Sequence, residues 1–420
     1  MELQWCSFCA REAEMNQILK AFQQASQENQ STLVCLEGAV GSGKRDFLQF
    51  FFQRVRDRAF VCYAKFDKNG GPEGQGSGDP GCMFASELLT ELLEQMASHR
   101  DATFWAERIR THVGKEGWVA QIVASMAPEP FARLVDCEKC SNIEEASKEV
   151  CPGDSSHNAN FDRVRYAVKS FFDLVSRYYP VVLVLDDLHW AHPHSLLLAA
   201  FLQEQSEHRH HLQRLTYVED TQREPLKLLT VVSYEPMAPS HPIYRLLFRN
   251  QIASASNIET HEDSTKLYQK IILLPLSVDD VANAMSRILR RDRHDVQSLA
   301  VIIHQRTNGD YLFIKEFVKM LKRKSLFTYS TTNFQWEWDE DKIRLQTDLS
   351  ENVVDMVLQS LKALPENVQM ILLSAALLGA LKFQSDFLLL VLHTVKKTLQ
   401  AEGLIQSPCA FLNVQSIEEL

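Results

Sequence analysis

Residues 38–44, with the sequence GAVGSGK, have the residue types and the spacing that bind phosphate. Glycines let backbone amides turn toward phosphate oxygens, and Lys44 adds a cation over the outer phosphates. The stretch follows an expected strand at residues 32–38 and precedes an expected helix at residues 45–58, whose N-terminus would attract the same anion. The pattern therefore predicts a nucleotide site formed by Gly38, Gly41, Ser42, Gly43 and Lys44.

The next residue, Arg45, stands where this pattern normally has Ser or Thr, whose hydroxyl binds Mg²⁺. A guanidinium cannot ligate a cation, although it can add an electrostatic hold on phosphate. Because Arg45 would also repel the metal, the sequence supports nucleotide binding better than turnover. An active ATPase would need Asp46 or a water molecule in place of the missing ligand.

A second candidate lies at the end of the apolar run VVLVLDD, where Asp186 and Asp187 follow a buried strand. We expect this strand to lie beside the phosphate loop in a doubly wound sheet. Asp186 would hold Mg²⁺ through water, and Asp187 would activate the attacking water if the protein is an enzyme. The alternative is that the two acids only end a strand at solvent.

The elements that must position these residues form an α/β pattern. The order strand, loop, helix, strand begins a parallel sheet, and the apolar runs at 181–186 and 226–236 supply central strands buried on both faces. Helical periodicity at 278–290, 296–305 and 311–324 predicts a helical lid. The expected fold is a P-loop NTPase parallel sheet with a helical lid, followed by a winged-helix-like helical domain.

These elements suggest three domains. Residues 1–276 form the nucleotide-binding domain, with an exposed loop at 67–81 and an insertion at 128–160; residues 277–348 form the lid; residues 349–420 form the winged-helix-like domain.

Composition narrows the function classes. The formal net charge of −10 and the isoelectric point of about 5.8 disfavour nucleic-acid binding. The N-terminus does not resemble a secretory signal, and the longest apolar stretch is too short for a membrane span. We expect an intracellular, cytoplasmic protein without membrane attachment, whose nine cysteines are reduced thiols.

Two further groups could bind metal. Cys137, Cys140 and Cys151, with His157 nearby, could form a zinc site, but free thiols are favoured because the surrounding sequence is irregular. His189, His192 and His194 could also bind a metal, but the expectation is that they are solvated loop residues.

Several stretches resemble one known family in their order along the chain: FCAREAEM, LEGAVGSGK, NFDRVRYAVKSFF, VVLVLDDLHWA, IILLPLSVDDV and RTNGDYLFIKEF. They are similar to the signal-transduction ATPases with numerous domains, the STAND branch of the AAA+ class. FQWEWDEDKI and the segment from residue 349 look like the ATPase modules of large signalling kinases and cyclases. In that family, residues 38–44 and 181–187 would be the Walker A and Walker B motifs.

The resemblance implies that Arg11 and Glu14 pack near the adenine side of a bound nucleotide, although Ala10 replaces the usual glycine. The alternative is an ion pair at the start of a helix, worth little if exposed. Glu235 stands where the family has a sensor arginine, His192 where it commonly has aspartate, and Tyr311 where its lid has proline.

The resemblance, with these departures, implies a regulatory module that binds ATP or ADP, has a weakened Mg²⁺ site and acts as a signalling switch with weak or absent hydrolysis. Protein partners in a signalling assembly are implied, and a nucleotide-dependent oligomer is compatible with the family. In the family, helical repeats and output domains would ordinarily follow the third domain, so the resemblance implies either a truncated gene model or partners on separate chains. The alternatives are an active AAA+ ATPase, a DNA-loading factor, which the acidic charge disfavours, and an interaction scaffold without nucleotide. The choice between adenine and guanine stays open.

Overall fold

The computed structural model describes residues 11–27, 31–66, 79–115, 117–135, 157–203, 226–238, 240–247, 268–332 and 334–346, with scattered positions between 358 and 373. Contacts divide the chain into two units, one within residues 6–276 and one that includes residues 277–420. Each is described by itself below. Among the described helices, none has the length and apolar character needed to cross a membrane.

The first unit is built on a five-stranded sheet in which neighbouring strands pair in parallel. The strands are β1 (Thr32–Gly38), β2 (Phe60–Lys65), β3 (Val181–Asp186), β4 (Leu228–Tyr234) and β5 (Tyr268–Leu273), in the spatial order β2-β3-β4-β1-β5. Every residue of β3 and β4 is buried, as expected for a sheet covered on both faces. The predicted α/β parallel-sheet fold is confirmed.

The order of the strands corrects one expectation. The strand that carries Asp186 does not pair with the phosphate-loop strand, because β4 lies between them. Sequence order cannot reveal this insertion, since β4 comes after both strands in the chain. As a result, residues at the end of β4 reach the acidic pair.

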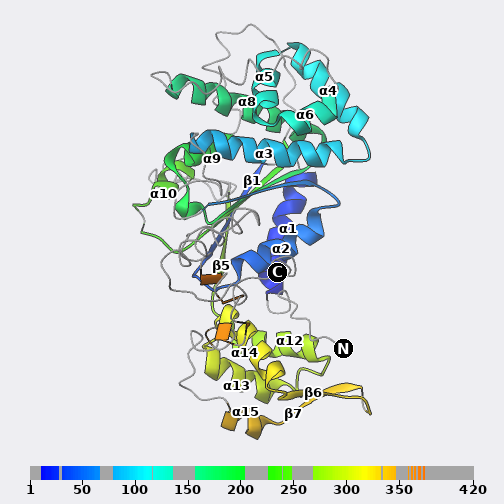
Figure 1. The fold of residues 1–420 in the computed structure, drawn as a ribbon, viewed down its shortest axis with the longest axis vertical. Helices are drawn as coiled ribbons and strands as arrows, with labels where there is room; N and C mark the ends of the chain where they lie inside the picture. Colours follow the sequence, from blue (N-terminus) through cyan, green and yellow to red (C-terminus); the bar gives the residue numbers. More distant parts are fainter. Residues whose placement is uncertain are drawn as a thin grey trace, which may run out of the picture. The chain divides into compact units, whose positions relative to one another are not determined.

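Alternate residues of β1 enter two different cores, one on each face of the sheet. Val34 and Leu36 pack with α1 (Glu12–Gln27) and α2 (Lys44–Val55). Leu33 and Cys35 belong to the core on the other face, to which α3 (Pro80–Ala97), α8 (His157–Tyr178) and α9 (Pro193–Gln203) contribute. Figure 1 shows α1 and α2 on one side of the strands and α3 on the other.

Further helices of this unit lie around α3: α4 (Ala102–Lys115), α5 (Gly117–Met126) and α6 (Pro128–Val135), while α10 (Pro242–Leu247) contacts α9. Helix α6 falls within the predicted insertion 128–160, and its buried residues include Phe131 and Leu134. The first part of that segment is therefore packed helix. The candidate zinc ligands Cys137, Cys140 and Cys151 lie outside the described residues. Cys35 and Cys62, both described and buried, are free thiols.

Helix α3 begins at Pro80, inside the exposed loop predicted at residues 67–81. The Asp79 carboxylate caps it by accepting hydrogen bonds from the backbone N–H groups of Gly81 and Cys82, at 2.8 and 3.2 Å, and Pro80 occupies the first turn. The last two residues of the predicted loop 67–81 are thus helical, and residues 67–78 lie outside the described part of the chain. Capping chemistry explains the difference, because it starts a helix before its apolar stripe begins.

Helix α3 also protects β2, which lies at the edge of the described sheet. Gln95 exchanges two hydrogen bonds with the backbone of Val61, at 2.9 and 2.6 Å, and the Glu91 carboxylate accepts one from the N–H of Tyr63 at 2.5 Å. These side chains satisfy backbone groups that would otherwise template pairing with another strand. Burial raises the pKa of Glu91 to about 7; the charges of Glu87 and Glu94 add to the rise, and the Tyr63 N–H opposes it.

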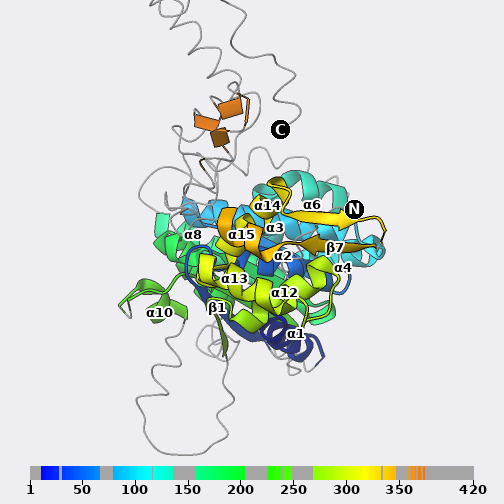
Figure 2. The ribbon, with the colours of Figure 1, turned by 90° about the horizontal axis from the view of Figure 1, so that it is seen from below.

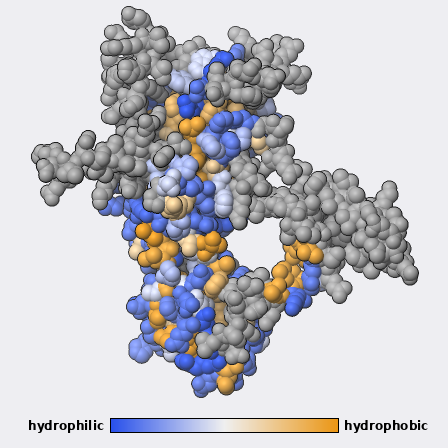
Figure 3. Space-filling model, turned by 90° about the vertical axis from the view of Figure 1, so that its left-hand side faces the viewer, coloured by the Kyte–Doolittle hydropathy of each residue, from blue (hydrophilic) through white to orange (hydrophobic). Residues whose placement is uncertain are grey.

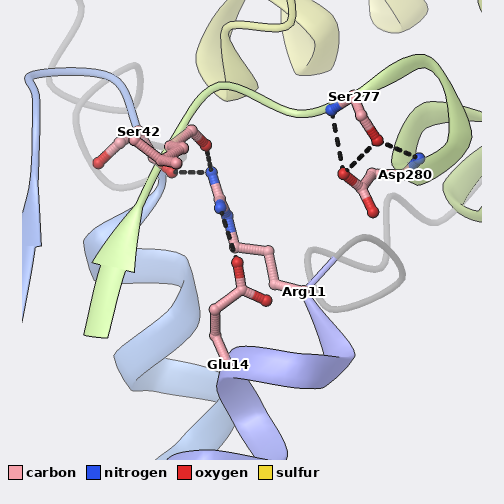
Figure 4. A network of polar contacts seen from close by, with 6 residues as sticks. Arg11, Glu14, Ser42, Ser277 and Asp280 are labelled. Atoms are coloured by element: carbon pink, nitrogen blue, oxygen red, sulfur yellow. Dashed lines mark hydrogen bonds and ion pairs between the residues drawn. The ribbon is translucent and has the colours of Figure 1, made fainter. Parts of the chain in front are cut away.

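The second unit contains α12 (Val278–Leu289), α13 (Gln297–Thr307) and α14 (Tyr311–Arg323), then strands β6 (Phe327–Ser330) and β7 (Gln335–Trp338) and the short α15 (Glu340–Gln346). Figure 2 shows the three helices together with the β6–β7 hairpin. Ser277 and Asp280 form a capping box at the start of α12 (Figure 4). The hairpin was not predicted, because its strands are too short for a clear alternation.

The predicted winged-helix-like domain, residues 349–420, lies outside the described residues apart from the scattered positions. On the face drawn in Figure 3, hydrophilic and hydrophobic residues are interspersed over the described surface.

Candidate functional site: a phosphate loop and an acidic cluster

The phosphate loop connects the end of β1 to the start of α2. Gly41 and Gly43 adopt left-handed backbone angles, with φ of 82° and 88°, which residues with side chains rarely adopt. Gly43 is the N-cap of α2 and, within the described residues, no side chain caps this helix start. The first turn of α2 therefore presents its amides and its positive helix end to an anion.

Gly38 and Ser42 form the floor of this loop. A Cβ at position 38 would lie 2.4 Å from Ser42 Oγ and 3.2 Å from Leu273 Cβ, so only glycine fits without a shift. Ser42 is 7% exposed, and its Oγ is buried without a hydrogen-bond partner among the described residues. A buried hydroxyl of this kind is costly unless a ligand satisfies it, so the loop fits a phosphate.

Lys44, the first residue of α2, folds back over the loop. Its side-chain ammonium donates hydrogen bonds to the carbonyl oxygens of Gly38, at 2.7 Å, and of Ala39, at 3.2 Å. The residue is 9% exposed, so its charge acts in a partly desolvated setting where electrostatic attraction is stronger than in water. A cation held here is well placed to neutralise outer phosphates.

Arg11, which precedes α1 and is 4% exposed, forms hydrogen bonds with the same loop. Its guanidinium donates to the carbonyl oxygen of Ser42 at 3.2 Å and to that of Leu274 at 2.6 Å, and it pairs with Glu14 at 3.2 Å (Figure 4). It thus ties the start of α1 to the phosphate loop and to the segment after β5. The ion pair with Glu14 is not the exposed pair weighed in the sequence, because the Arg11 side chain is 5% exposed.

Arg45 is exposed on the first turn of α2, and Asp46 beside it is half-buried. The Arg45 charge lowers the pKa of the Tyr63 phenol, although burial and the neighbouring Asp186 raise that pKa overall. Since Tyr63 touches Asp186, the cation acts on the side of the loop where the acidic residues lie.

Asp186, at the end of β3, is 3% exposed and already accepts two hydrogen bonds. The Tyr63 hydroxyl donates to its Oδ2 at 2.8 Å, and the Ser233 hydroxyl donates to its Oδ1. The N–H of Asp187 in turn donates to Ser233 Oγ at 3.0 Å. Tyr63 and Ser233 come from the two strands that flank β3, β2 and β4, and sequence reasoning missed both, because only the strand order brings them to Asp186.

Asp187 follows β3 in a left-handed conformation with φ of 54°. Burial raises the pKa of its carboxyl, Asp186 and Glu235 add to the rise, and the charges of Lys44 and Lys65 oppose it. The Lys44 charge thus acts on Asp187, as expected if the phosphate loop and the acidic residues share one site.

His189 and Glu235 complete the acidic side. The His189 side chain is 7% exposed, so the expectation that it is a solvated loop residue is wrong, and its Nε2 lies 3.5 Å from Glu235 Oε1. Burial lowers the pKa of His189, whereas the Glu235 charge raises it. Trp190, the next residue, is 37% exposed and is not part of the core.

Mg²⁺ fits this site only in part. Asp186 has the carboxylate chemistry that Mg²⁺ prefers and would hold the ion through water, but its two oxygens already serve Tyr63 and Ser233. Arg45 offers no oxygen ligand. Asp46 is half-buried on the first turn of α2, the same turn as Arg45.

Comparison with known proteins adds a family. Residues 7–215 match the family model described as an AAA ATPase domain. A 128-residue stretch is 30% identical to "Hybrid signal transduction histidine kinase G" of Dictyostelium discoideum, covering 30% of this chain and 4% of that protein.

Two solved structures are also similar. The Cdc6p crystal structure from Pyrobaculum aerophilum has a TM-score of 0.35 at 13% identity, over 75% of this chain and 62% of the other. The ORC1 protein of Aeropyrum pernix in complex with DNA has a TM-score of 0.35 at 11% identity, over 97% and 81%. Given the family match and the parallel sheet with its phosphate loop, residues 7–215 belong to the AAA ATPase domain family.

Proposed function

We propose that this chain binds ATP or ADP and acts as a STAND-type regulatory switch with weak or absent hydrolysis. The observation that carries the proposal is the contrast at the start of α2. The loop of Gly38, Gly41, Gly43 and Lys44 has the backbone shape and the cation that hold phosphates, and Arg45 follows it where a metal-binding hydroxyl would be needed.

Weak hydrolysis is supported by the charge around the reaction centre. Arg45 is a fixed cation that competes with Mg²⁺, and Glu235 puts a negative charge where the resembling family has a sensor arginine. Both changes withdraw stabilisation from the transferring phosphoryl group, and a single electrostatic group of this kind is typically worth about 3–4 kcal/mol in the transition state.

The switch itself needs a second state. In this proposal, nucleotide contacts bias the arrangement of the nucleotide-binding unit and the helical lid at 277–348, and residues 349–420 report that arrangement to a protein partner. The match to a stretch of a signalling kinase is compatible with such an assembly. DNA binding is not part of the proposal, because the chain carries a net charge of −10.

The test is calorimetry of ATP and ADP binding to the purified chain, with and without Mg²⁺, while phosphate release is followed in the same samples. Tight binding that depends on Lys44 and proceeds without turnover supports the switch. Rapid, Mg²⁺-dependent phosphate release lost in Asp187→Asn would establish the second candidate, an active ATPase. Absence of binding at saturating ATP would leave a nucleotide-free scaffold and overturn the proposal.

A further inference from the structure

Three potential metal ligands converge beside the phosphate loop, at the carboxyl ends of two neighbouring strands. Asp187 follows β3, His189 lies in the short 3-10 turn after it (Leu188–Trp190), and Glu235 follows β4. One ligand atom from each lies within 4.8 Å of the others, and His189 Nε2 is 3.5 Å from Glu235 Oε1. The parallel pairing of β3 with β4 brings Glu235 to Asp187 and His189, which lie 48 and 46 positions before it in the chain.

The state of His189 points to a ligand. Its side chain is 7% exposed, and both ring nitrogens are buried without a hydrogen-bond partner among the described residues. Buried polar atoms nearly always have a partner, since leaving one unsatisfied costs free energy. Glu235 Oε1 attracts the ring but does not form a hydrogen bond with it. An ion between the imidazole and the carboxylates would satisfy the ring nitrogen that faces them.

The charges around the cluster favour a bound cation in part. Asp186, Asp187 and Glu235 are three acids in one region, and an ion among them would reduce their mutual repulsion. The neutral imidazole is the form of histidine that binds a metal. Lys44, Lys65 and His241 are the cationic or titratable neighbours that influence these groups, and they oppose the binding of a cation.

We propose that Asp187, His189 and Glu235 form a site for a divalent transition-metal ion of the Zn²⁺ class, separate from the Mg²⁺ that would accompany a nucleotide. One imidazole and two carboxylates make a mixed nitrogen and oxygen donor set, and imidazole favours Zn²⁺ or Co²⁺ over Mg²⁺. Ligands of a tetrahedral zinc ion lie about 3.4 Å apart for metal–ligand bonds of about 2.1 Å. His189 Nε2 and Glu235 Oε1, 3.5 Å apart, already have nearly that separation.

The site does not depend on the nucleotide proposal, because it can be tested without nucleotide. The probe is Co²⁺, titrated into the metal-free full-length chain with excess Mg²⁺ present and followed by calorimetry and visible absorption. We expect one ion bound per chain, with the absorption of a nitrogen and oxygen site and no intense thiolate charge-transfer band. A thiolate band that accounts for all the binding would assign the ion to cysteines and overturn the proposal.

Two variants and one matched control make the test specific. Glu235→Gln keeps the shape of the side chain and is expected to weaken Co²⁺ binding at least tenfold, and His189→Asn is expected to weaken it further. His194→Gln is the control: this histidine also contacts a carboxylate, with Nδ1 2.6 Å from Asp79 Oδ2, but it belongs to no three-ligand group in the described structure. Circular dichroism verifies that each variant is folded. Equal Co²⁺ affinity in the wild type and in folded Glu235→Gln would refute the site.

Discussion

The phosphate loop and the acidic cluster face the same site but are built differently. The loop is local: Gly38 to Lys44 are consecutive, and their glycine angles and the Lys44 hydrogen bonds arise within seven residues, with Arg11 as an added brace. The acidic side, centred on Asp186, is assembled from three strands, because its hydrogen-bond donors Tyr63 and Ser233 come from β2 and β4, on either side of β3. Local sequence is enough to specify the first region, whereas the second requires the sheet.

The comparison also separates binding from catalysis. In our proposal the loop holds phosphate, whereas Arg45 and Glu235 stand at the positions where the family that the chain resembles has a metal-binding hydroxyl and a sensor arginine. The proposal therefore places the departures from the family on the catalytic side of the site. Four experiments test whether this division is real, from the largest expected effect to the smallest.

Lys44→Ala should weaken ATP binding by a factor of about 100 or more, or about 3 kcal/mol, because it removes the buried cation of the loop. Calorimetry measures the effect. Lys20→Ala, an exposed lysine on α1, is the control and should bind as the wild type does. A change of less than threefold in Lys44→Ala would mean that the loop does not hold phosphate.

Gly38→Ala should lower the free energy of unfolding by about 2 kcal/mol, since its Cβ would lie 2.4 Å from Ser42 Oγ. Thermal or urea unfolding measures the loss. Adding Ser42→Ala removes the clashing oxygen, so the double variant should recover part of the lost stability. The double variant should therefore lose less free energy of unfolding than the sum of the two single variants, and the difference measures the clash between positions 38 and 42. Full additivity of the two changes would show that the loop relaxes without strain.

Arg45→Thr should raise Mg²⁺-dependent phosphate release about tenfold, or about 1.4 kcal/mol, because it removes the repelling cation and supplies a hydroxyl ligand. Arg45→Gln separates the two effects, since it removes the charge without a Thr-type ligand. Steady-state phosphate release at saturating ATP is the readout. Unchanged turnover in both variants would place the catalytic defect elsewhere, with Glu235→Arg the next change to make.

Glu91→Gln should reduce the difference in the free energy of unfolding between pH 5 and pH 7 by about 1 kcal/mol. The folded protein raises the pKa of Glu91 from 4.5 to about 7, so it binds more protons than the unfolded chain between these values, and stability falls as the pH rises from about 4.5 to about 7. Glutamine removes this proton while its amide oxygen can still accept from the Tyr63 N–H. Urea unfolding at pH 5 and pH 7 measures this dependence, with Glu107→Gln, an exposed glutamate on α4, as control. An equally steep dependence in Glu91→Gln would assign the proton to another group.

Local sequence predicts an element best where the residue types allow only one structure, as glycines do in a tight loop. The glycines of the phosphate loop and the apolar strands follow from backbone freedom and hydrophobic patterning, and the structure shows both. The early start of α3 depends on the Asp79 cap, and the short β6–β7 hairpin has too little alternation to be predicted. Helix caps and short strand pairs are difficult to predict from sequence, because each depends on only a few residues.

The sequence by itself determined the phosphate loop, the two acids after an apolar strand and the α/β class, because each depends on neighbours within a few residues. The tertiary structure alone decided that β4 lies between β1 and β3, that Ser233 and Tyr63 donate to Asp186, and that Arg11 reaches Ser42 and Leu274. It also buried His189 beside Glu235. The physical reason is that parallel strands far apart in sequence end at one edge of the sheet, and only their order sets which side chains meet there.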